Sequence, residues 1–155
     1  MTKVDWYCKP FHQLSVKEFH NLLELRINVF VVEQNCPYSE IDGKDEFSFH
    51  IWGVQANKVI AVARILPPGV SYSEWSIGRV ASSLEVRNNA VGKELMKQAI
   101  TQIYAQAKQA VPIRISAQLY LKKFYESFEF IQQGDTYLED DIPHIEMLRK
   151  ANEPA

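Results

Sequence analysis

The stretch that decides the fold is GRVASSLEVRNNAVGKELM, residues 78–96. Its first part continues a strand-like pattern over residues 74–82, and its last part opens an amphipathic helix over residues 92–107. A loop at this point meets the free N–H groups and positive dipole of a helix start, which attract anions. Residues 86–92 therefore predict a phosphate-binding loop at the carboxyl end of a strand. The alternative is a plain polar turn, because the loop holds a single glycine, Gly92.

Outside this stretch, strand-like and helix-like segments follow one another along the whole chain. Ser15 and Glu18 form a capping box that predicts a helix start, and the helix that follows is apolar on most of its circumference, which predicts burial. Residues 55–57 are short enough to join two strands as a hairpin. The expected strands are 3–8, 49–55, 58–66, 74–82 and 113–117, with an irregular hairpin to about 147, and the expected helices are 15–34, 92–107 and a short one within 119–130. This order predicts an α/β (α+β) fold with a mixed, mostly antiparallel central sheet and helices on both faces.

The composition limits the classes of function. The 155 residues are 46% hydrophobic with a net charge of −2, so a hydrophobic core is expected and nucleic acid is not an expected partner. No apolar run approaches the roughly 20 residues of a membrane span, and the N-terminus lacks the apolar segment of a signal peptide. The two cysteines are too few for a disulfide framework and, with four histidines, match no zinc pattern. We therefore expect a cytoplasmic protein without a metal or a membrane partner.

The opening stretch resembles the coenzyme A loop of the GNAT N-acetyltransferase superfamily, with Arg87 and Gly92 at matching positions and Ala90 where the family prefers glycine. Further segments resemble the ElaA-like subfamily and cover about Trp6 to Leu148: LRINVFVVEQNCPY, EIDGKDEFSFH, ARILPP, IGRV, AQLYLKKFYESFEF and YLEDDIPHIEML. Glu129 and Asp141 replace two more family glycines. The resemblance implies one GNAT domain over residues 1–155, with a frayed tail at 149–155.

The resemblance also implies acetyl-CoA as co-substrate. The backbone N–H groups that would bind its pyrophosphate belong to Arg87, Asn88, Asn89, Ala90, Val91, Gly92 and Lys93. The strand edge at Val80, Ala81 and Ser82 would pair with the pantetheine arm like an extra strand. A thioester held along such a groove, with its carbonyl on an N–H donor, is set up for attack by an amine.

Four residues are candidates for proton transfer. Tyr125 stands where many GNAT enzymes carry the tyrosine that protonates the departing thiolate, and its alternative role is an aromatic between helix and sheet. An amine acceptor must lose a proton, so a base or a water chain is also needed. Glu33, His144 and Glu74 are the candidate bases, and each has a structural alternative.

Arg26, Arg64 and Arg79 stand among apolar neighbours, where a buried guanidinium needs a partner. One interpretation is a set of structural ion pairs, for Arg26 with Glu33, Asp42 or Asp45. The other places these arginines, with Asp42 and His50, in the acceptor-binding site.

The resulting hypothesis is direct transfer of an acetyl group from acetyl-CoA to a primary amine of a small molecule or protein, without a covalent enzyme intermediate. Homodimers are common in the family, so the resemblance also allows this protein to form a homodimer. One alternative is an acyltransferase similar to acyl-homoserine-lactone synthases, based on the series Arg26, Phe30, Glu40, Asp42, Asp45 and Arg64. The other is a non-catalytic, regulatory coenzyme A-binding domain, because three family glycines are lost.

Overall fold

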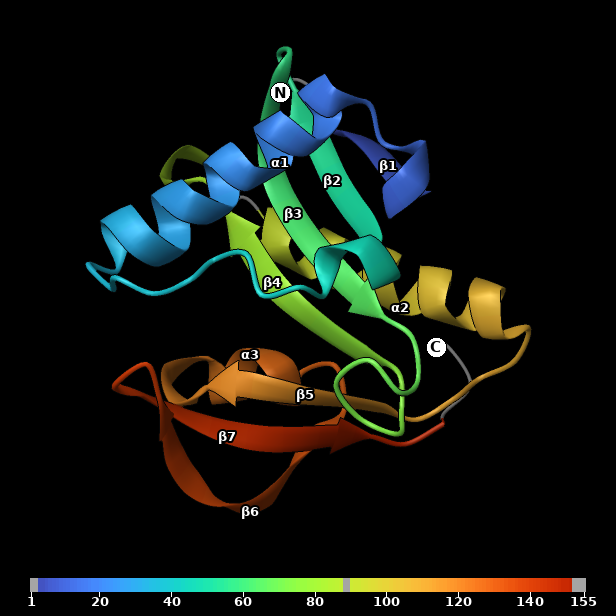
Figure 1. Ribbon diagram of the computed structural model, residues 1–155. Coiled ribbons are helices and arrows are strands. Elements are labelled where there is room, and N and C mark those ends of the chain that lie inside the picture. Colours follow the sequence, from blue (N-terminus) through green and yellow to red (C-terminus); the bar gives the residue numbers. More distant parts are fainter. Residues whose placement is uncertain (1–2, 88–89, 152–155) are drawn as a thin grey trace.

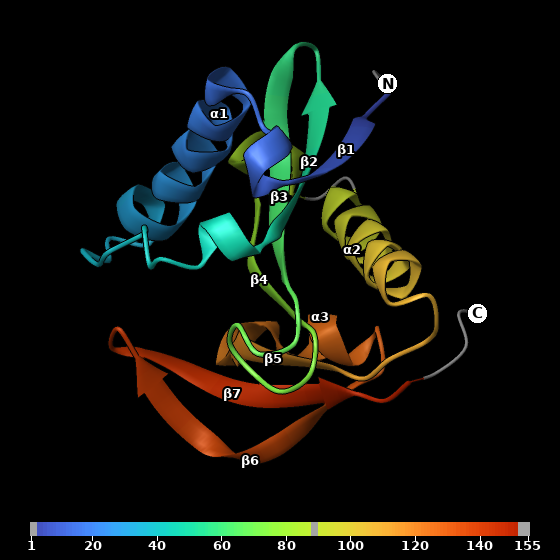
Figure 2. The ribbon, with the colours of Figure 1, turned by 45° about the vertical axis from the view of Figure 1, so that its right-hand side comes forward.

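Two antiparallel sheets form the frame of the molecule (Figures 1 and 2), and the computed structural model describes residues 3–87 and 90–151. The four-stranded sheet has the order β1-β2-β3-β4, and the three-stranded sheet has the order β5-β7-β6. The strands are β1 (Asp5–Pro10), β2 (Phe49–Gln55), β3 (Lys58–Leu66), β4 (Ser76–Ser82), β5 (Ile113–Gln118), β6 (Phe130–Glu139) and β7 (Ile142–Arg149). The predicted class, one mixed α+β domain, is confirmed, although the expected central sheet is divided in two.

The helices follow the strands in the predicted order. The long helices are α1 (Val16–Ile27) and α2 (Val91–Ala107), and the shorter ones are η1 (Phe11–Gln13), the π-helical η2 (Asn28–Glu33), η3 (Asp45–Phe47), η4 (Leu84–Val86), η5 (Leu119–Leu121) and α3 (Lys122–Glu126). In the described part of the chain, none of these helices has the length and apolar character needed to cross a membrane.

The two sheets meet at one point and then separate. Trp75 and Ile113 form an isolated parallel bridge, and the Arg114 N–H donates to the Trp75 carbonyl at 2.9 Å. Beyond this bridge β4 and β5 belong to different sheets and diverge (Figure 1). The divergence opens a space between the two strands, and the site described below lies there.

Helices cover both faces of the four-stranded sheet, as predicted. The period-2 alternation of β3 sends Ala61, Ala63 and Ile65 into the core beneath α2, while Val62 packs in a second core beneath α1. The apolar stripe of α2 was therefore predicted correctly.

Helix α1 begins as predicted but is less buried than predicted. Ser15 Oγ accepts from the Glu18 N–H at 3.0 Å, and the Glu18 carboxylate accepts from the Ser15 N–H at 2.8 Å, which completes the capping box. Only one side of the helix and of η2 packs on the sheet, so Ile27 is 39% and Val32 66% exposed. The expectation of burial around most of the circumference was wrong, because solvent rather than a second layer covers the outer side.

The predictions of a hairpin turn and of a C-terminal tail have different outcomes. The hairpin between β2 and β3 is confirmed, with Ala56 and Asn57 at φ 50° and 63°, the signs that a tight type I′ turn requires. The frayed tail was placed to start too early. Arg149 ends β7, is buried and donates to the Phe128 carbonyl at 2.9 Å, so the ordered strand includes it.

Candidate active site

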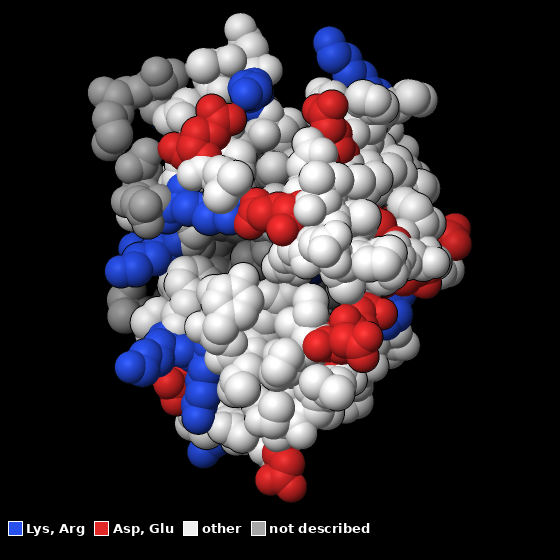
Figure 3. Space-filling model, turned by 90° about the vertical axis from the view of Figure 1, so that its left-hand side faces the viewer, with Lys and Arg blue, Asp and Glu red and all other residues white. Residues whose placement is uncertain are grey.

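A cavity of about 690 Å³ occupies the space between the diverging strands. Its walls come from β4, β5, β7 and α3, and from the loops around residues 34–44, 66–76 and 139–142. The space-filling view shows the surface hollowed between the two halves of the molecule, with charged side chains of both signs beside the hollow (Figure 3). A cavity of this size, open to solvent, can hold a small ligand.

A bulge in β4 forms part of the cavity wall. Val62 pairs with Ala81 and Arg64 pairs with Gly78, so Arg79 and Val80 together face the single residue Ala63 of β3. Arg79 has φ 51°, a left-handed conformation that costs an L-residue other than glycine about 1–2 kcal/mol. The sequence gives no signal for this bulge, because glycine is the usual residue at such a position.

A network of ion pairs, the charge network, lies behind this wall and contains Arg26, Glu40, Asp42, Asp45, Arg64 and Arg79. Arg26 is 2% exposed and donates to Glu40 Oε2 at 2.6 Å through Nε and to Asp45 Oδ1 at 2.9 Å through Nη1. Burial opposes ionisation of Asp45, but the hydrogen bonds and charges of Arg26 and Arg64 outweigh it and hold the pKa of this carboxyl below its ordinary value. Arg26 is therefore structurally paired, as one interpretation held: Asp45 was one of its three expected partners, and Glu40 was not among them.

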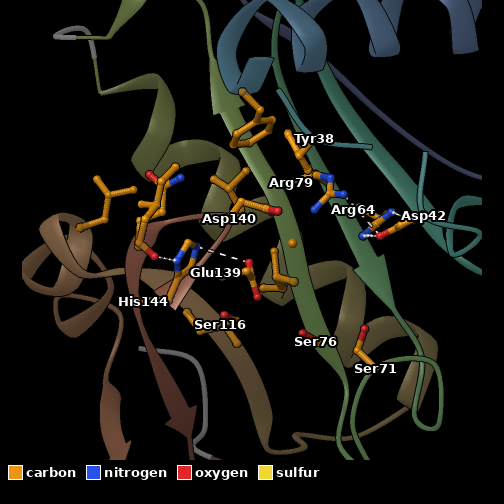
Figure 4. Close-up of a pocket in the computed structure, with 18 of the residues that line it drawn as sticks. Tyr38, Asp42, Arg64, Ser71, Ser76, Arg79, Ser116, Glu139, Asp140 and His144 are labelled. Carbon is orange, nitrogen blue, oxygen red and sulfur yellow. Dashed lines mark hydrogen bonds and ion pairs between the residues drawn. The ribbon is translucent and has the colours of Figure 1, made fainter. Parts of the chain in front are cut away.

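The two other arginines reach the cavity. Arg64 pairs with Asp42 at 2.8 Å, and Arg79 pairs with Glu40 at 2.8 Å and with Asp42 at 3.4 Å. Tyr38 donates to the Glu40 carboxylate, and its ring lies 5.5 Å from the Arg79 guanidinium. Arg64, Arg79 and Asp42 line the cavity (Figure 4), so three of the five predicted acceptor-binding residues lie there.

The remaining two are set back from the cavity. Arg26 lies behind Glu40, and His50 is 2% exposed with Nε2 against the Asp45 carbonyl at 2.9 Å. The His50 ring lies about 6 Å from the rings of Phe11 and Phe19. Burial lowers the pKa of His50. Neither side chain belongs to the cavity lining.

The position of Tyr125 is compatible with both roles that the sequence left open. It is 6% exposed and packs edge-to-face against Phe124 and Phe130, and it also lines the cavity. Burial raises the pKa of Tyr125 well above its ordinary value, because the phenolate would lose solvation. The side chain is therefore a neutral phenol with a proton to donate.

His144 lines the same cavity from β7 (Figure 4). Its Nδ1 lies 2.7 Å from the Ile142 carbonyl, which can only accept, so Nδ1 carries the hydrogen. In the neutral ring Nε2 then carries the lone pair that can accept a proton, and it lies 3.4 Å from Glu139 Oε2. Tyr137 stacks on the ring at 6.1 Å. This set could not be read from the sequence, because it depends on the register between β6 and β7.

Glu33 and Glu74 are not brought to the cavity, and each holds an arginine elsewhere. The Glu33 carboxylate pairs with Arg87 at 2.5 and 2.7 Å. Glu74 pairs with Arg114 at 2.8 Å, and these hydrogen bonds lower the pKa of its carboxyl to about 2. Of the three candidate bases, only His144 lies in the same cavity as Tyr125.

The start of α2 lies at the end of the predicted anion-binding loop. Ala90 is the N-cap in a left-handed conformation, φ 60°, and its side chain does not cap the helix. The N–H groups of the first turn, from Val91, Gly92 and Lys93, are donors that an anion can use. Asn88 and Asn89 lie outside the described residues.

Arg87 and the end of β4 complete the predicted cofactor region. The Arg87 guanidinium donates to the Ser82 carbonyl at 2.8 Å in addition to Glu33, so its side chain ties the loop to the strand. Val80 lines the cavity, whereas Ala81 is 6% exposed and packs beneath α1.

An amide pair joins the two halves at the cavity mouth. The side chains of Gln34 and Gln118 exchange two hydrogen bonds, at 3.1 and 3.2 Å, across the space between η2 and β5. Cys36 Sγ lies 3.6 Å from the Asp140 carbonyl beside it. Among residues 3–87 and 90–151, no group of three or more His, Cys, Asp or Glu side chains could hold a metal ion.

The fold is that of a GNAT acyltransferase. The Acetyltransferase (GNAT) domain family matches residues 23–151, and the chain belongs to this family. It is similar to the Escherichia coli (strain K12) protein ElaA, 40% identical over 95% of this chain and 97% of the relative. An acyl-CoA N-acyltransferase structure from Pseudomonas aeruginosa is 40% identical, covers 95% of this chain and 99% of its own, and has a TM-score of 0.88. The coenzyme A-dependent acyl-homoserine lactone synthase BjaI, at 12% identity, TM-score 0.74 and coverage of 98% and 84%, shares the fold alone.

Proposed function

We propose that this protein is an N-acetyltransferase that moves an acetyl group from acetyl-CoA directly to a primary amine. The observation that carries the proposal is the placement of a phenol and an imidazole in one cavity. Tyr125 enters from α3 and His144 from β7, and both line the space beside the β4 bulge. One group has a proton to give and the other has a lone pair to receive one, which direct acyl transfer requires.

The proposed reaction moves one proton from nitrogen to sulfur. The amine nitrogen attacks the thioester carbonyl, a C–N bond forms, and His144 Nε2 accepts the proton that the amine loses. Backbone N–H groups of β4 hold the carbonyl oxygen while it carries negative charge. The C–S bond then breaks, and Tyr125 donates its phenolic proton to the departing sulfur. Exchange with water returns the imidazolium and the phenolate to their neutral forms.

The start of α2 is proposed to bind the pyrophosphate. The N–H groups of the first turn and the positive end of the helix dipole suit that group, and an alanine at position 90 still supplies the backbone N–H that the family glycine would supply. Both cysteines are free thiols, which suits the reducing cytoplasm that we expect.

The test is product formation with a panel of primary amines. Purified protein would be incubated with acetyl-CoA and each amine, with thiol release followed by absorbance and the amide identified by mass spectrometry. We expect an acetylated amine with at least one member. Binding of acetyl-CoA without any amide, across small amines, polyamines and lysine peptides, would favour the regulatory binding domain.

The acyl-homoserine-lactone-type alternative rests on the charge network. In this chain Arg26 pairs with both Glu40 and Asp45, and each of the three is at most 6% exposed, so this part of the network does not offer its charges to a ligand. Offering S-adenosylmethionine as the acceptor, with acetyl-CoA and longer acyl-CoA donors, separates the two activities. A lactone product would replace the N-acetyltransferase proposal.

A further inference from the structure

Arg79 holds a left-handed conformation inside a strand. Other described residues with positive φ, such as Ala56, Asn57 and Lys108, stand in turns or at helix ends, where that conformation is ordinary. Residues held in sparsely populated backbone conformations persist when their surroundings over-determine them, and they gather at active sites.

The Arg79 side chain is fastened to the loop that follows η2. Its Nε donates to Glu40 Oε2 at 2.8 Å, and its Nη2 donates to the Glu40 carbonyl at 3.2 Å and to Asp42 Oδ2 at 3.4 Å. The Tyr38 ring covers the guanidinium. These contacts commit the side chain to protein partners, although Arg79 forms part of the cavity wall (Figure 4).

Glu40, the main partner of Arg79, is in turn bound to a buried residue of the core. Glu40 Oε2 also accepts from Arg26, which is 2% exposed in α1. Glu40 therefore links the bulge in β4 to a helix on the opposite side of the loop. A bulge held in this way has a fixed geometry, and bulges beside active sites commonly re-aim the groups that they carry.

We propose that Arg79 is a positioning residue: its guanidinium locks the β4 bulge so that the backbone N–H groups at Arg79 and Val80 face the thioester carbonyl. This inference rests on the proposed function, because it adds a side chain that holds in place the backbone donors used in that reaction. It gives Arg79 a role different from acceptor binding. The side chain acts through the backbone of its own strand, and the acceptor does not need to touch it.

Two variants of Arg79 test whether its side-chain contacts hold the bulge. Arg79→Gly removes the guanidinium and also removes the strain, because glycine accepts positive φ. Arg79→Lys keeps the cation but loses the two-pronged hydrogen bonding, so it should recover only part of the effect. Arg114→Met is the matched control, because Arg114 pairs with Glu74 and Glu146 and does not line the cavity.

The first measurement needs no acceptor. Acetyl-CoA labelled with ¹³C at the carbonyl would be bound at saturation, and its resonance compared with that of the free molecule. A hydrogen bond moves the carbonyl resonance downfield. We expect this shift in the wild type and in Arg114→Met, at least half of it lost in Arg79→Gly, and an intermediate value in Arg79→Lys. The Kd of free coenzyme A should stay within threefold in all four proteins, because its pyrophosphate is proposed to bind at the start of α2 and not at the bulge.

The second measurement uses the amine that gives product in the panel. We expect kcat to fall 10- to 100-fold in Arg79→Gly while KM for the amine stays within threefold. A raised KM with unchanged kcat would make Arg79 an acceptor-binding residue and overturn the inference. So would an unchanged carbonyl shift in Arg79→Gly, or a wild type that binds acetyl-CoA with no shift. A wild type that does not bind acetyl-CoA at all would instead refute the proposed function.

Discussion

His144 Nε2 lies 3.4 Å from the Glu139 carboxylate, while the Ile142 carbonyl fixes the hydrogen on the opposite ring nitrogen. The two contacts together orient the ring, and the shorter one, to the Ile142 carbonyl, places the hydrogen of the neutral ring on Nδ1. A ring nitrogen with a lone pair, beside a carboxylate that can stabilise the cation, suits the proposed deprotonation of an amine.

His144→Gln is expected to lower kcat by about 10²–10⁴-fold, the usual contribution of a general base. Glu139 is half exposed, so Glu139→Gln should cost only about two- to fivefold, in line with the energy of a solvent-exposed pair. Steady-state kinetics with the amine that gives product measures both effects. His20→Gln, at an exposed position on α1, is the control and should retain full activity. Equal activity of His144→Gln and His20→Gln would remove His144 from the mechanism.

Tyr125→Phe is expected to keep the fold and lose turnover. The phenyl ring preserves the packing against Phe124 and Phe130, and loss of a general acid costs about 10²–10⁴-fold in rate. Titration calorimetry should give a nearly unchanged Kd for acetyl-CoA, because the phenol acts on the departing sulfur. Tyr7→Phe, on the edge strand β1, serves as the matched control and should behave as wild type. Full turnover in Tyr125→Phe contradicts the acid role.

Ala90→Gly is expected to stabilise the protein. Glycine relieves the left-handed strain at φ 60°, about 1–2 kcal/mol, and loses part of this gain to the greater entropy of the unfolded chain. The net effect should be a gain of about 0.5–1 kcal/mol in the free energy of unfolding, with at most a tenfold change in acetyl-CoA affinity.

Ala105→Gly is the control for that substitution, because Ala105 is exposed within α2. There glycine should destabilise by about 1 kcal/mol, the ordinary helix-interior cost. Denaturant unfolding of both variants measures the change in the free energy of unfolding, which should be a gain in Ala90→Gly and a loss in Ala105→Gly. Destabilisation of similar size in both would mean that Ala90 is not strained.

Stability should fall in acid because of Asp45. Its pKa is lowered in the folded state, so its contribution is fully present above its unfolded value of about 4 and is lost as the pH falls through the folded value. Thermal unfolding between pH 7 and pH 3 should show the melting temperature of the wild type falling below about pH 5.

Asp45→Asn isolates that contribution. It should lose on the order of 3 kcal/mol at pH 7, because Arg26 and Arg64 remain buried with a weaker partner, and its decline in acid should be shallower. Asp135→Asn, on the exposed strand β6, should follow the wild-type curve. Parallel curves for Asp45→Asn and the wild type would assign the acid sensitivity to other groups.

Sequence patterns within a few residues predicted the helices and strands of this fold well. The features that they did not predict depend on pairing between strands that are distant in sequence. The capping box at Ser15, the hairpin turn and the stripe of α2 depend on residues close in sequence. The division of the sheet depends on where β4 meets β5, and the bulge at Arg79 depends on register with β3. Neither leaves a local pattern.

The candidate bases show the same limit. Glu33 was a reasonable candidate until its partner was known, and that partner, Arg87, is 54 residues away in sequence. His144 could be singled out as a histidine, but its tautomer and its neighbour Glu139 follow from the turn between β6 and β7. Sequence alone therefore predicted which residue types were needed and not which of them meet.

The divergence of β4 from β5 also bears on how the molecule avoids aggregation. Unpaired strand edges are normally docking places for stray strands from other chains. Here the two edges that separate beyond Trp75 and Ile113 face each other inside the molecule, and the Gln34–Gln118 amide pair spans the space near the far end of β5. A strand from another chain could reach these edges only by entering between the two halves of the molecule, and its side chains need room on both faces. A thin, unbranched chain that carries its own amide groups needs less room, so the placement that protects the edges also favours a ligand of that shape.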